Sequence, residues 1–270
     1  MAPRPFWTGY LKLSLVNCRV AMAPAITSSE RVRFRTLNQR TGNPVVSRYV
    51  DAVSGKPLAE DAEVKGYPRG EDEYVMLEDE ELDAVALETT HTIDIESFVP
   101  SDSVSWIWYD RPHYLTPDDE VGEEAFAVIR DAMATTKMVG LSRLVLYRRE
   151  RPVLLQPRDK GIVVWTLRYS DEVRDPELYF EGIETGKADS KLMGMVKSLI
   201  KERTKDWDPA MVNDPVQERL IEIVASKKKG RCPPKSKTEP EAERPSNVID
   251  IMDALRRSLK SDKGGKAKRK

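Results

Sequence analysis

The first 175 residues carry many short apolar runs, and this feature constrains the fold more than any other. Several runs alternate apolar and polar side chains, as a β-strand with one buried face does. The runs cover residues 7–20, 74–77, 91–99, 106–115, 141–147, 153–155 and 162–169. Only two helical stretches interrupt them, at residues 78–87 and after Thr116. The pattern predicts an α+β protein that is mainly β, built as a barrel or a sandwich rather than from alternating βαβ units.

The helix after Thr116 has a clear start signal. Pro117 stands at its first turn, and Asp118 and Asp119 place acids at the positive end of the helix dipole. Apolar residues at helical spacing predict a buried stripe made of Val121, Ala125, Val128, Ile129 and Ala132. We expect this helix to pack on the strands through that stripe.

The character of the chain changes after residue 186, where strand patterns stop. Helical periodicity covers residues 187–226 and includes a helix that begins at Asp214-Pro215. Residues 227–246 hold four prolines and almost no apolar side chain, which predicts a disordered linker. Residues 247–270 consist of a small amphipathic helix and a basic tail. A helix of about 13 residues is marginal alone in water, so its apolar stripe requires a groove on a partner or on its own core.

A basic stretch at residues 31–40 is the strongest binding signal in the chain. In a strand, Arg31, Arg33 and Arg35 would share one face at intervals of about 6–7 Å. Gly42-Asn43-Pro44 supplies a turn and residues 45–50 form a second β-rich run, so a hairpin is predicted. Two interpretations remain open: a guanidinium row for the phosphates of a nucleic acid, or a solvated edge strand that discourages aggregation.

Charge is distributed unevenly, although the net charge of the chain is only -1. Residues 1–59 carry nine Lys and Arg against Glu30 and Asp51, for a net charge of +7. Residues 60–124 carry 21 acids against three bases, for a net charge of -18, and residues 227–270 have a net charge of +9. This asymmetry predicts a basic face and a basic tail that are separated from an acidic exterior.

No pattern of residues indicates catalysis or a resident cofactor. Two cysteines, Cys18 and Cys232, and two histidines, His91 and His113, offer no metal-ligand spacing. Phosphate-binding glycine loops are absent, and neither histidine stands in a nucleophile motif. Without a signal peptide or an apolar run long enough to span a bilayer, the chain is expected to be cytoplasmic. We therefore expect no catalytic residue, no metal and no cofactor.

Several stretches resemble the bacterial Ku family, the DNA-end-binding proteins of non-homologous end joining. They run in order along nearly the whole chain: 6–9 (Phe-Trp-Thr-Gly), 15–17, 65–67, 74–77, 93–95, 109–115, 166–175 (Thr-Leu-Arg-Tyr-Ser-Asp-Glu-Val-Arg-Asp) and 247–255. The resemblance implies a β-barrel core over residues 1–186 with a bridging, DNA-encircling arm at about 28–70. It implies a homodimeric ring around duplex DNA that recruits an ATP-dependent multifunctional DNA ligase of the ligase D type. The helical arm at 187–226 would clasp the partner subunit.

The resemblance also assigns the basic residues and the last helix to binding roles. The expected DNA-binding residues are Arg31, Arg33, Arg35, Arg40, Arg48, Lys56, Lys263, Lys266, Lys268, Arg269 and Lys270. The expected ligase-binding stripe is Val248, Ile251, Met252, Leu255 and Leu259. Residues 166–175 are expected to brace the barrel without touching DNA. The alternative is a sequence-specific regulator that uses the basic hairpin, although the sequence shows no helix-turn-helix or zinc-finger pattern. A further alternative, an enzyme acting on nucleic acid, would lack a nucleophile or metal site.

Overall fold

The structure is a computed structural model that describes residues 4–27, 29, 31–59, 62–71, 73–85, 91–183, 186 and 189–230. The chain divides into two units, which are considered separately. Unit 1 holds Met1–Glu30 and Phe34–Leu178, and unit 2 holds Arg31–Arg33 and Tyr179–Lys270. The predicted domain boundaries stay a prediction. None of the described helices is long and apolar enough to cross a membrane.

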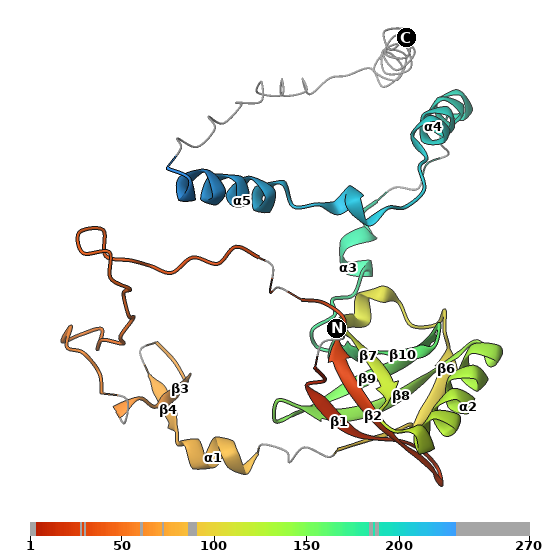
Figure 1. Ribbon diagram of the computed structural model, residues 1–270, viewed down its shortest axis with the longest axis horizontal. Coiled ribbons are helices and arrows are strands. Elements are labelled where there is room, and N and C mark those ends of the chain that lie inside the picture. The colour runs from red at the N-terminus through yellow and green to blue at the C-terminus, as the bar shows by residue number, and fades with distance from the viewer. Residues whose placement is uncertain are drawn as a thin grey trace. The chain divides into compact units, whose positions relative to one another are not determined.

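An eight-stranded sheet forms the body of unit 1 (Figure 1). Its strands follow the order β5-β1-β2-β7-β10-β9-β8-β6. In that order they span Thr92–Asp94, Trp7–Leu13, Val16–Pro24, Tyr109–Pro117, Gly161–Leu167, Arg149–Arg158, Met138–Leu146 and Ser97–Pro100. All neighbours are antiparallel except β1 and β5, which are parallel.

The two edge strands of this curled sheet are consecutive in the chain, and one extended segment links the two edges. The backbone N–H of Ile95 donates to the carbonyl of Lys12 at 2.9 Å, and the N–H of Glu96 donates to the carbonyl of Leu141 at 2.9 Å. The hydroxyl of Ser142 adds a bond to the carbonyl of Asp94 at 2.5 Å. One extended segment thus leaves β1 and joins β8. The predicted mainly-β fold with a barrel core is confirmed.

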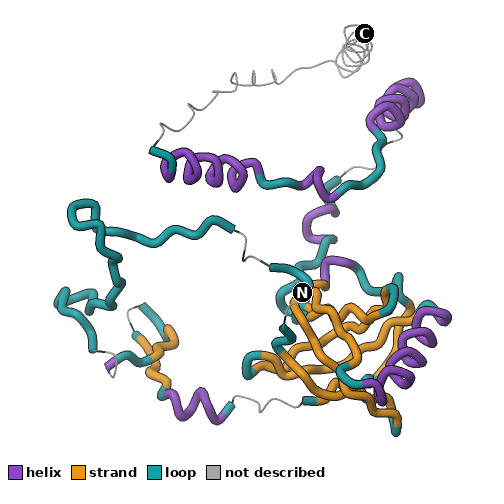
Figure 2. Tube along the Cα trace, in the orientation of Figure 1, coloured by secondary structure: helices purple, strands orange, loops and turns teal. Residues whose placement is uncertain are grey.

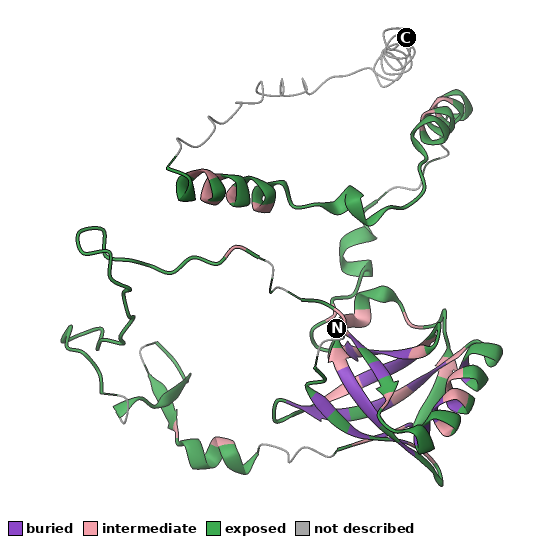
Figure 3. Cartoon of the chain, in the orientation of Figure 1, coloured by how far each residue is buried: buried purple, intermediate pink, exposed green. Residues whose placement is uncertain are grey.

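Alternation along the strands fills the barrel with apolar side chains. In β1 the buried residues are Trp7, Gly9 and Leu11, and the residues between them are exposed. Most buried positions lie in the strands predicted from apolar runs, and Figure 3 shows them concentrated in the barrel. The shared core comprises Leu11, Val20, Met22, Ile93, Leu115, Leu144, Val153, Leu155, Ile162 and Val164, among others. The turn between β1 and β2 lies at Ser14-Leu15, and it leaves the Leu15 side chain exposed.

Helix α2 (Glu120–Thr136) packs on β2, β8 and β9 with a different stripe from the one expected. Val121 is 91% exposed, Val128 is 63% exposed and Ala132 is exposed as well, so the predicted stripe is wrong at these three positions. The helix instead buries Phe126, Ile129 and Met133 in the core. Its N-cap is Asp119, whose carboxylate accepts the N–H of Gly122 at 2.6 Å.

Residues 31–59 contain no regular strand, which corrects the predicted hairpin at 31–40 and 45–50 (Figure 2). Only two isolated bridges form, Leu37 with Pro44 and Val50 with Pro57. A turn spans residues 38–43, where Gly42 has a positive φ of 73° and the N–H of Asn38 donates to the Asn43 carbonyl at 2.9 Å. A hairpin of β3 (Lys65–Pro68) and β4 (Tyr74–Leu77) follows, and then the acidic helix α1 (Asp79–Ala84), as predicted.

Unit 2 is helical, and a short 3-10 helix (Pro209–Val212) lies in the connection between its two longer helices. Helix α4 spans Ser190–Arg203 and helix α5 spans Pro215–Lys228, whereas the short α3 (Glu177–Phe180) lies at the division between the units. Asp214 caps α5 by accepting the N–H groups of Val216 and Gln217, as expected for the Asp-Pro start. Neither α4 nor α5 buries a residue. Lys227 and Lys228, the first residues of the predicted linker at 227–246, belong to α5. The linker from residue 231, the last helix and the basic tail lie outside the described residues.

Candidate nucleic-acid interface

The cations of residues 31–59 are all exposed. Arg40 lies in the turn at 38–43 and Lys56 in a similar turn at 51–56, so charge is spread along the whole segment. The exposed set is Arg31, Arg33, Arg35, Arg40, Arg48 and Lys56. The segment contains a single acid, Asp51. The segment therefore presents a strongly positive surface to solvent.

Asp51 is engaged by its own turn. Its carboxylate accepts the backbone N–H of Ser54 at 2.5 Å and that of Val53 at 3.1 Å. Because these bonds favour the ionised form, chiefly the one from Ser54, the pKa of Asp51 lies below its ordinary value. The one acid of the segment therefore accepts hydrogen bonds from the backbone of the 51–56 turn.

The predicted guanidinium row is not formed. The backbone N–H of Val32 donates to the side-chain oxygen of Gln217 in α5 at 3.0 Å, and Arg31–Arg33 belong to unit 2, whereas Arg35 belongs to unit 1. Phe34, expected on the apolar back of a strand, is 71% exposed. The role of these arginines in binding DNA stays a prediction, but even spacing along one strand is no longer part of it.

The acidic region after residue 60 uses several of its carboxylates within unit 1. Lys65 of β3 pairs with Asp79 of α1 at 3.1 Å. Asp83 of the same helix pairs with Arg148 in the β8–β9 turn at 2.5 Å. All four side chains are largely exposed, so each pair contributes little stability, but together they tie α1 to the hairpin and to the barrel.

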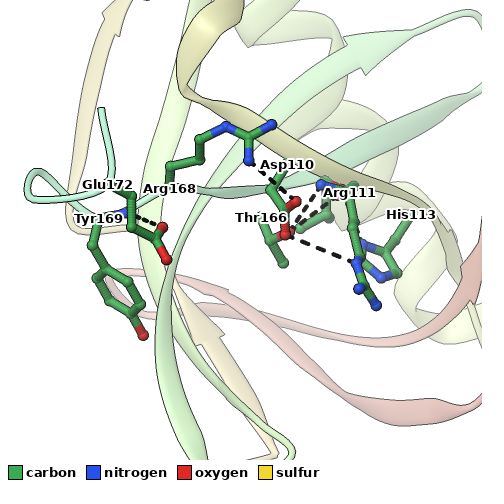
Figure 4. Close-up of polar contacts among 8 residues, drawn as sticks. Asp110, Arg111, His113, Thr166, Arg168, Tyr169 and Glu172 are labelled. Atoms are coloured by element: carbon green, nitrogen blue, oxygen red, sulfur yellow. Dashed lines mark hydrogen bonds and ion pairs between the residues drawn. The ribbon is translucent and has the colours of Figure 1, made fainter. Parts of the chain in front are cut away.

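The stretch at 166–175 begins with a buried hydroxyl in the barrel wall. Thr166 is 3% exposed, and its Oγ1 accepts the backbone N–H of Arg111 at 3.1 Å. The register between β10 and β7 shifts between Trp165 and Leu167, so the hydroxyl supplies an acceptor where the ladder is irregular. Figure 4 shows this hydroxyl between Asp110 and Arg111.

The residues after Thr166 hold the neighbouring loops. Arg168 donates from Nε to the carbonyl of Ile107 at 3.1 Å and lies 3.6 Å from the carboxylate of Asp110. The N–H of Tyr169 donates to the carboxylate of Glu172 at 2.9 Å (Figure 4). Arg168 therefore has partners inside unit 1, which supports a bracing role for this stretch.

Two buried titratable groups belong to the barrel core. His113 is 7% exposed, and burial lowers its pKa below the ordinary value. Burial raises the pKa of the Cys18 thiol, which contacts the carbonyl of Leu11. Both shifts favour the neutral forms, as expected of groups that pack rather than react. Among the described residues, no group of His, Cys, Asp and Glu could hold a metal ion.

Two sets of predicted site residues lie outside the described residues. The ligase-binding set is Val248, Ile251, Met252, Leu255 and Leu259. The basic tail is Lys263, Lys266, Lys268, Arg269 and Lys270. Both assignments stay predictions.

One surface was missed from sequence, a hollow of about 630 Å³ on the outside of the barrel. Its lining includes Tyr114, Trp165, Arg158 and Lys160. Alternation within 109–117 and 161–167 was the available signal, because it separates inward from outward residues.

Comparison with known proteins identifies the family. Residues 12–194 match the family model described as the Ku70/Ku80 beta-barrel domain. Three proteins named non-homologous end joining protein Ku are similar over almost their full length. The one from Methylocella silvestris is 64% identical, with 96% of each chain covered. The one from Gluconacetobacter diazotrophicus is 58% identical, covering 97% of this chain and 99% of its own. The one from Allorhizobium ampelinum is 56% identical, covering 98% of this chain and all of its own.

The matched range contains the barrel strands from the end of β1 onward, together with the stretch at 166–175. The resemblance read from the sequence is confirmed: the chain belongs to the Ku family.

Proposed function

We propose that this protein binds the ends of double-stranded DNA in non-homologous end joining, without regard to base sequence. Its role is binding and recruitment rather than catalysis. The observation that carries the proposal is the exposed cationic segment 31–59 in a chain of the Ku family. Phosphate contacts position a protein on DNA without reading bases, which is what a protein for arbitrary broken ends requires.

We further propose a homodimer whose arms surround the duplex. Residues 31–85 expose many large apolar side chains that one protomer leaves uncovered, such as Phe34, Val46, Tyr49, Tyr67 and Met76. Exposed apolar surface on this scale is typical of an interface, and an isolated two-stranded hairpin is marginal in water. Sedimentation at micromolar concentration tests this step, and a stable monomer would refute it.

Recruitment of an ATP-dependent ligase of the ligase D type completes the proposal. It rests on the amphipathic sequence at 247–259, whose apolar positions form one helical stripe. A helix of this kind would dock in an apolar groove on the ligase, while the basic tail adds general attraction to DNA.

The decisive experiment compares linear with closed circular DNA of the same sequence. Labelled linear duplex is bound to the protein and challenged with either the intact circle or the same circle cut once. We expect the cut form to compete far better, because only it offers ends. Equal competition by the circle would refute end binding. Competition that changes with the base sequence of the competitor DNA would favour a sequence-specific regulator.

A further inference from the structure

The outer face of the barrel carries a hollow that residues 31–59 do not account for. It lies across β7, β10 and the β9–β10 turn and reaches the residues that follow β2. Its volume of about 630 Å³ is within the range of roughly 300–1,000 Å³ that small-ligand sites occupy. Its lining is chiefly apolar, with Arg158, Asp159 and Lys160 at one side.

Cross-strand register creates the hollow. Val163 of β10 lies opposite Tyr114 of β7, and Gly161 lies opposite Arg158 of β9. Since Gly161 has no side chain, a long side chain stands beside an open position on this face. An added Cβ at Gly161 would meet only the Leu115 carbonyl, at 3.3 Å, so little else fills the position.

A fixed indole forms one wall of the hollow. The Nε1 of Trp165 donates to the side-chain oxygen of Gln156 at 3.2 Å, and its ring stacks on Tyr109 with centroids 5.1 Å apart. Tyr114, in contrast, is 54% exposed. The hollow therefore offers one immobilised aromatic ring and one accessible ring, in the manner of a surface on which a flat base can stack.

The cationic side of the hollow stands on a rigid turn. Asp159 has a positive φ of 50°, and Arg130 of α2 donates to the carbonyl of Lys160 at 2.8 Å. The carboxylate of Asp159 is 91% exposed and lies 4.0 Å from Nε of Arg158, a distance at which the pair is weak. Two cations against one acid leave this side positive.

The hollow also lies at the root of the cationic segment. The N–H of Ala25 donates to the carbonyl of Pro112 at 3.1 Å, and Ala25 and Ile26 both line the hollow. The chain continues from Ile26 toward residues 31–59, which carry the proposed DNA-binding cations. In sequence, only four residues separate Ile26 from Arg31, the first of these cations.

We propose that this hollow binds an unpaired nucleotide of a single-stranded overhang at a DNA end. The base stacks on Tyr114 and Trp165, and a flanking phosphate pairs with Arg158 and Lys160. The proposal rests on the proposed function and adds a substrate class to it, since ends with overhangs are then distinguished from blunt ends.

The sheet disfavours a peptide as the occupant. The hollow is built on β7, β10 and β9, and each of these strands is paired on both sides. An extended peptide binds a sheet by adding to an unpaired edge, and no such edge borders the hollow. Positive charge beside aromatic surface suits a nucleotide, which carries its negative charge and its flat apolar face in one unit.

The experiment measures the affinity of the full chain for three probes with the same duplex. One is blunt, one has a short oligothymidine overhang, and one has an equal overhang of tetrahydrofuran abasic residues, which keeps the phosphates and lacks the bases. Tyr114→Leu removes the accessible ring but keeps apolar volume. Tyr10→Leu is the matched control, because Tyr10 is another exposed strand tyrosine of the barrel, at 45% exposure.

The wild type should bind the thymidine overhang more tightly than the other two probes. Tyr114→Leu should weaken binding to that probe by about 5- to 150-fold and leave the blunt probe unchanged, whereas Tyr10→Leu should change neither. Replacing Arg158 and Lys160 together with Gln should weaken binding to both overhangs. Retained blunt-end binding shows that each variant is folded.

Equal wild-type affinity for all three probes would overturn the proposal. So would a Tyr114→Leu variant that keeps the thymidine preference, a result that would leave the hollow to a protein partner. Failure of the wild type to bind the blunt duplex refutes the proposed function instead, so the two failures are distinguishable.

Discussion

Replacing Thr166 with valine tests whether the stretch at 166–175 braces the barrel. The substitution keeps the shape of the side chain but removes the hydroxyl that accepts the N–H of Arg111 at 3.1 Å. The same hydroxyl lies 3.4 Å from the carboxylate of Asp110. A buried donor left without its partner costs about 1–3 kcal/mol. Because this contact is only partly buried, we expect Thr166→Val to lower the free energy of unfolding by about 1–2 kcal/mol.

Urea unfolding followed by tryptophan fluorescence measures this change, with Thr166→Ser as the matched control. Serine keeps the hydroxyl and loses a methyl group, which costs about 0.8 kcal/mol by lost burial. Hydrogen exchange separates the two causes, because the Arg111 amide should exchange faster in the valine variant alone. DNA affinity of the folded protein should not change in either variant. A valine variant as stable as the wild type, or one that loses DNA binding while folded, would refute the bracing role.

Four further outcomes are expected. Gly9→Ala should destabilise the barrel by about 3 kcal/mol or more in urea unfolding, because the added Cβ would lie 2.3 Å from the His91 carbonyl oxygen and 2.5 Å from the Trp7 ring. Gly70→Ala is the control and should have little effect, since Gly70 has open space around it. The free energy of unfolding should fall as the pH decreases below about 6.5, because burial lowers the pKa of His113 in the folded state and the unfolded state then binds the proton more readily. His113→Gln should flatten this dependence of stability on pH, and an unchanged dependence would contradict the prediction. Replacing Arg31, Arg33 and Arg35 with Ala should weaken DNA binding equally for all base sequences, and should reduce the slope of log affinity against log salt concentration by roughly one per lost phosphate contact. The same change at three exposed barrel cations, Lys137, Arg143 and Arg149, should have a smaller effect. Leu255→Asp should abolish ligase pull-down and leave linear DNA pull-down intact; the reverse result would show that the last helix serves DNA.

The barrel was predictable from sequence because its strands bury one face. Alternation at 91–99 placed Ile93 and Ile95 inward, and both are buried. The sequence did not predict the buried stripe of α2 correctly. The predicted positions 121, 125, 128 and 132 have the same helical spacing as the buried positions 122, 126, 129 and 133, so spacing alone does not choose between them. The size of Phe126 and Met133 decides between the two stripes, since the core takes the larger side chains.

Local sequence patterns did not predict the backbone of residues 31–59 or the hollow on the outer face of the barrel. Residues 31–40 alternate like a strand, but Phe34 and its neighbours have no sheet to pack against, so only isolated bridges form. The hollow depends on the pairing of β7 with β10, segments about fifty residues apart whose register no local pattern determines. Sequence therefore supplied the cations of the candidate interface but not their arrangement.

The irregular backbone of residues 31–59 itself bears on the choice between an end-binding protein and a sequence-specific regulator. Reading bases requires side chains held by a helix or a β-ribbon that fits the major groove. Residues 31–59 form neither, yet they hold six exposed cations and one acid that is bound by its own turn. Such a segment can neutralise phosphates, which repeat identically along any duplex, but it lacks the regular geometry that would distinguish one base pair from another. Charge without a base-reading element therefore favours binding that is independent of sequence.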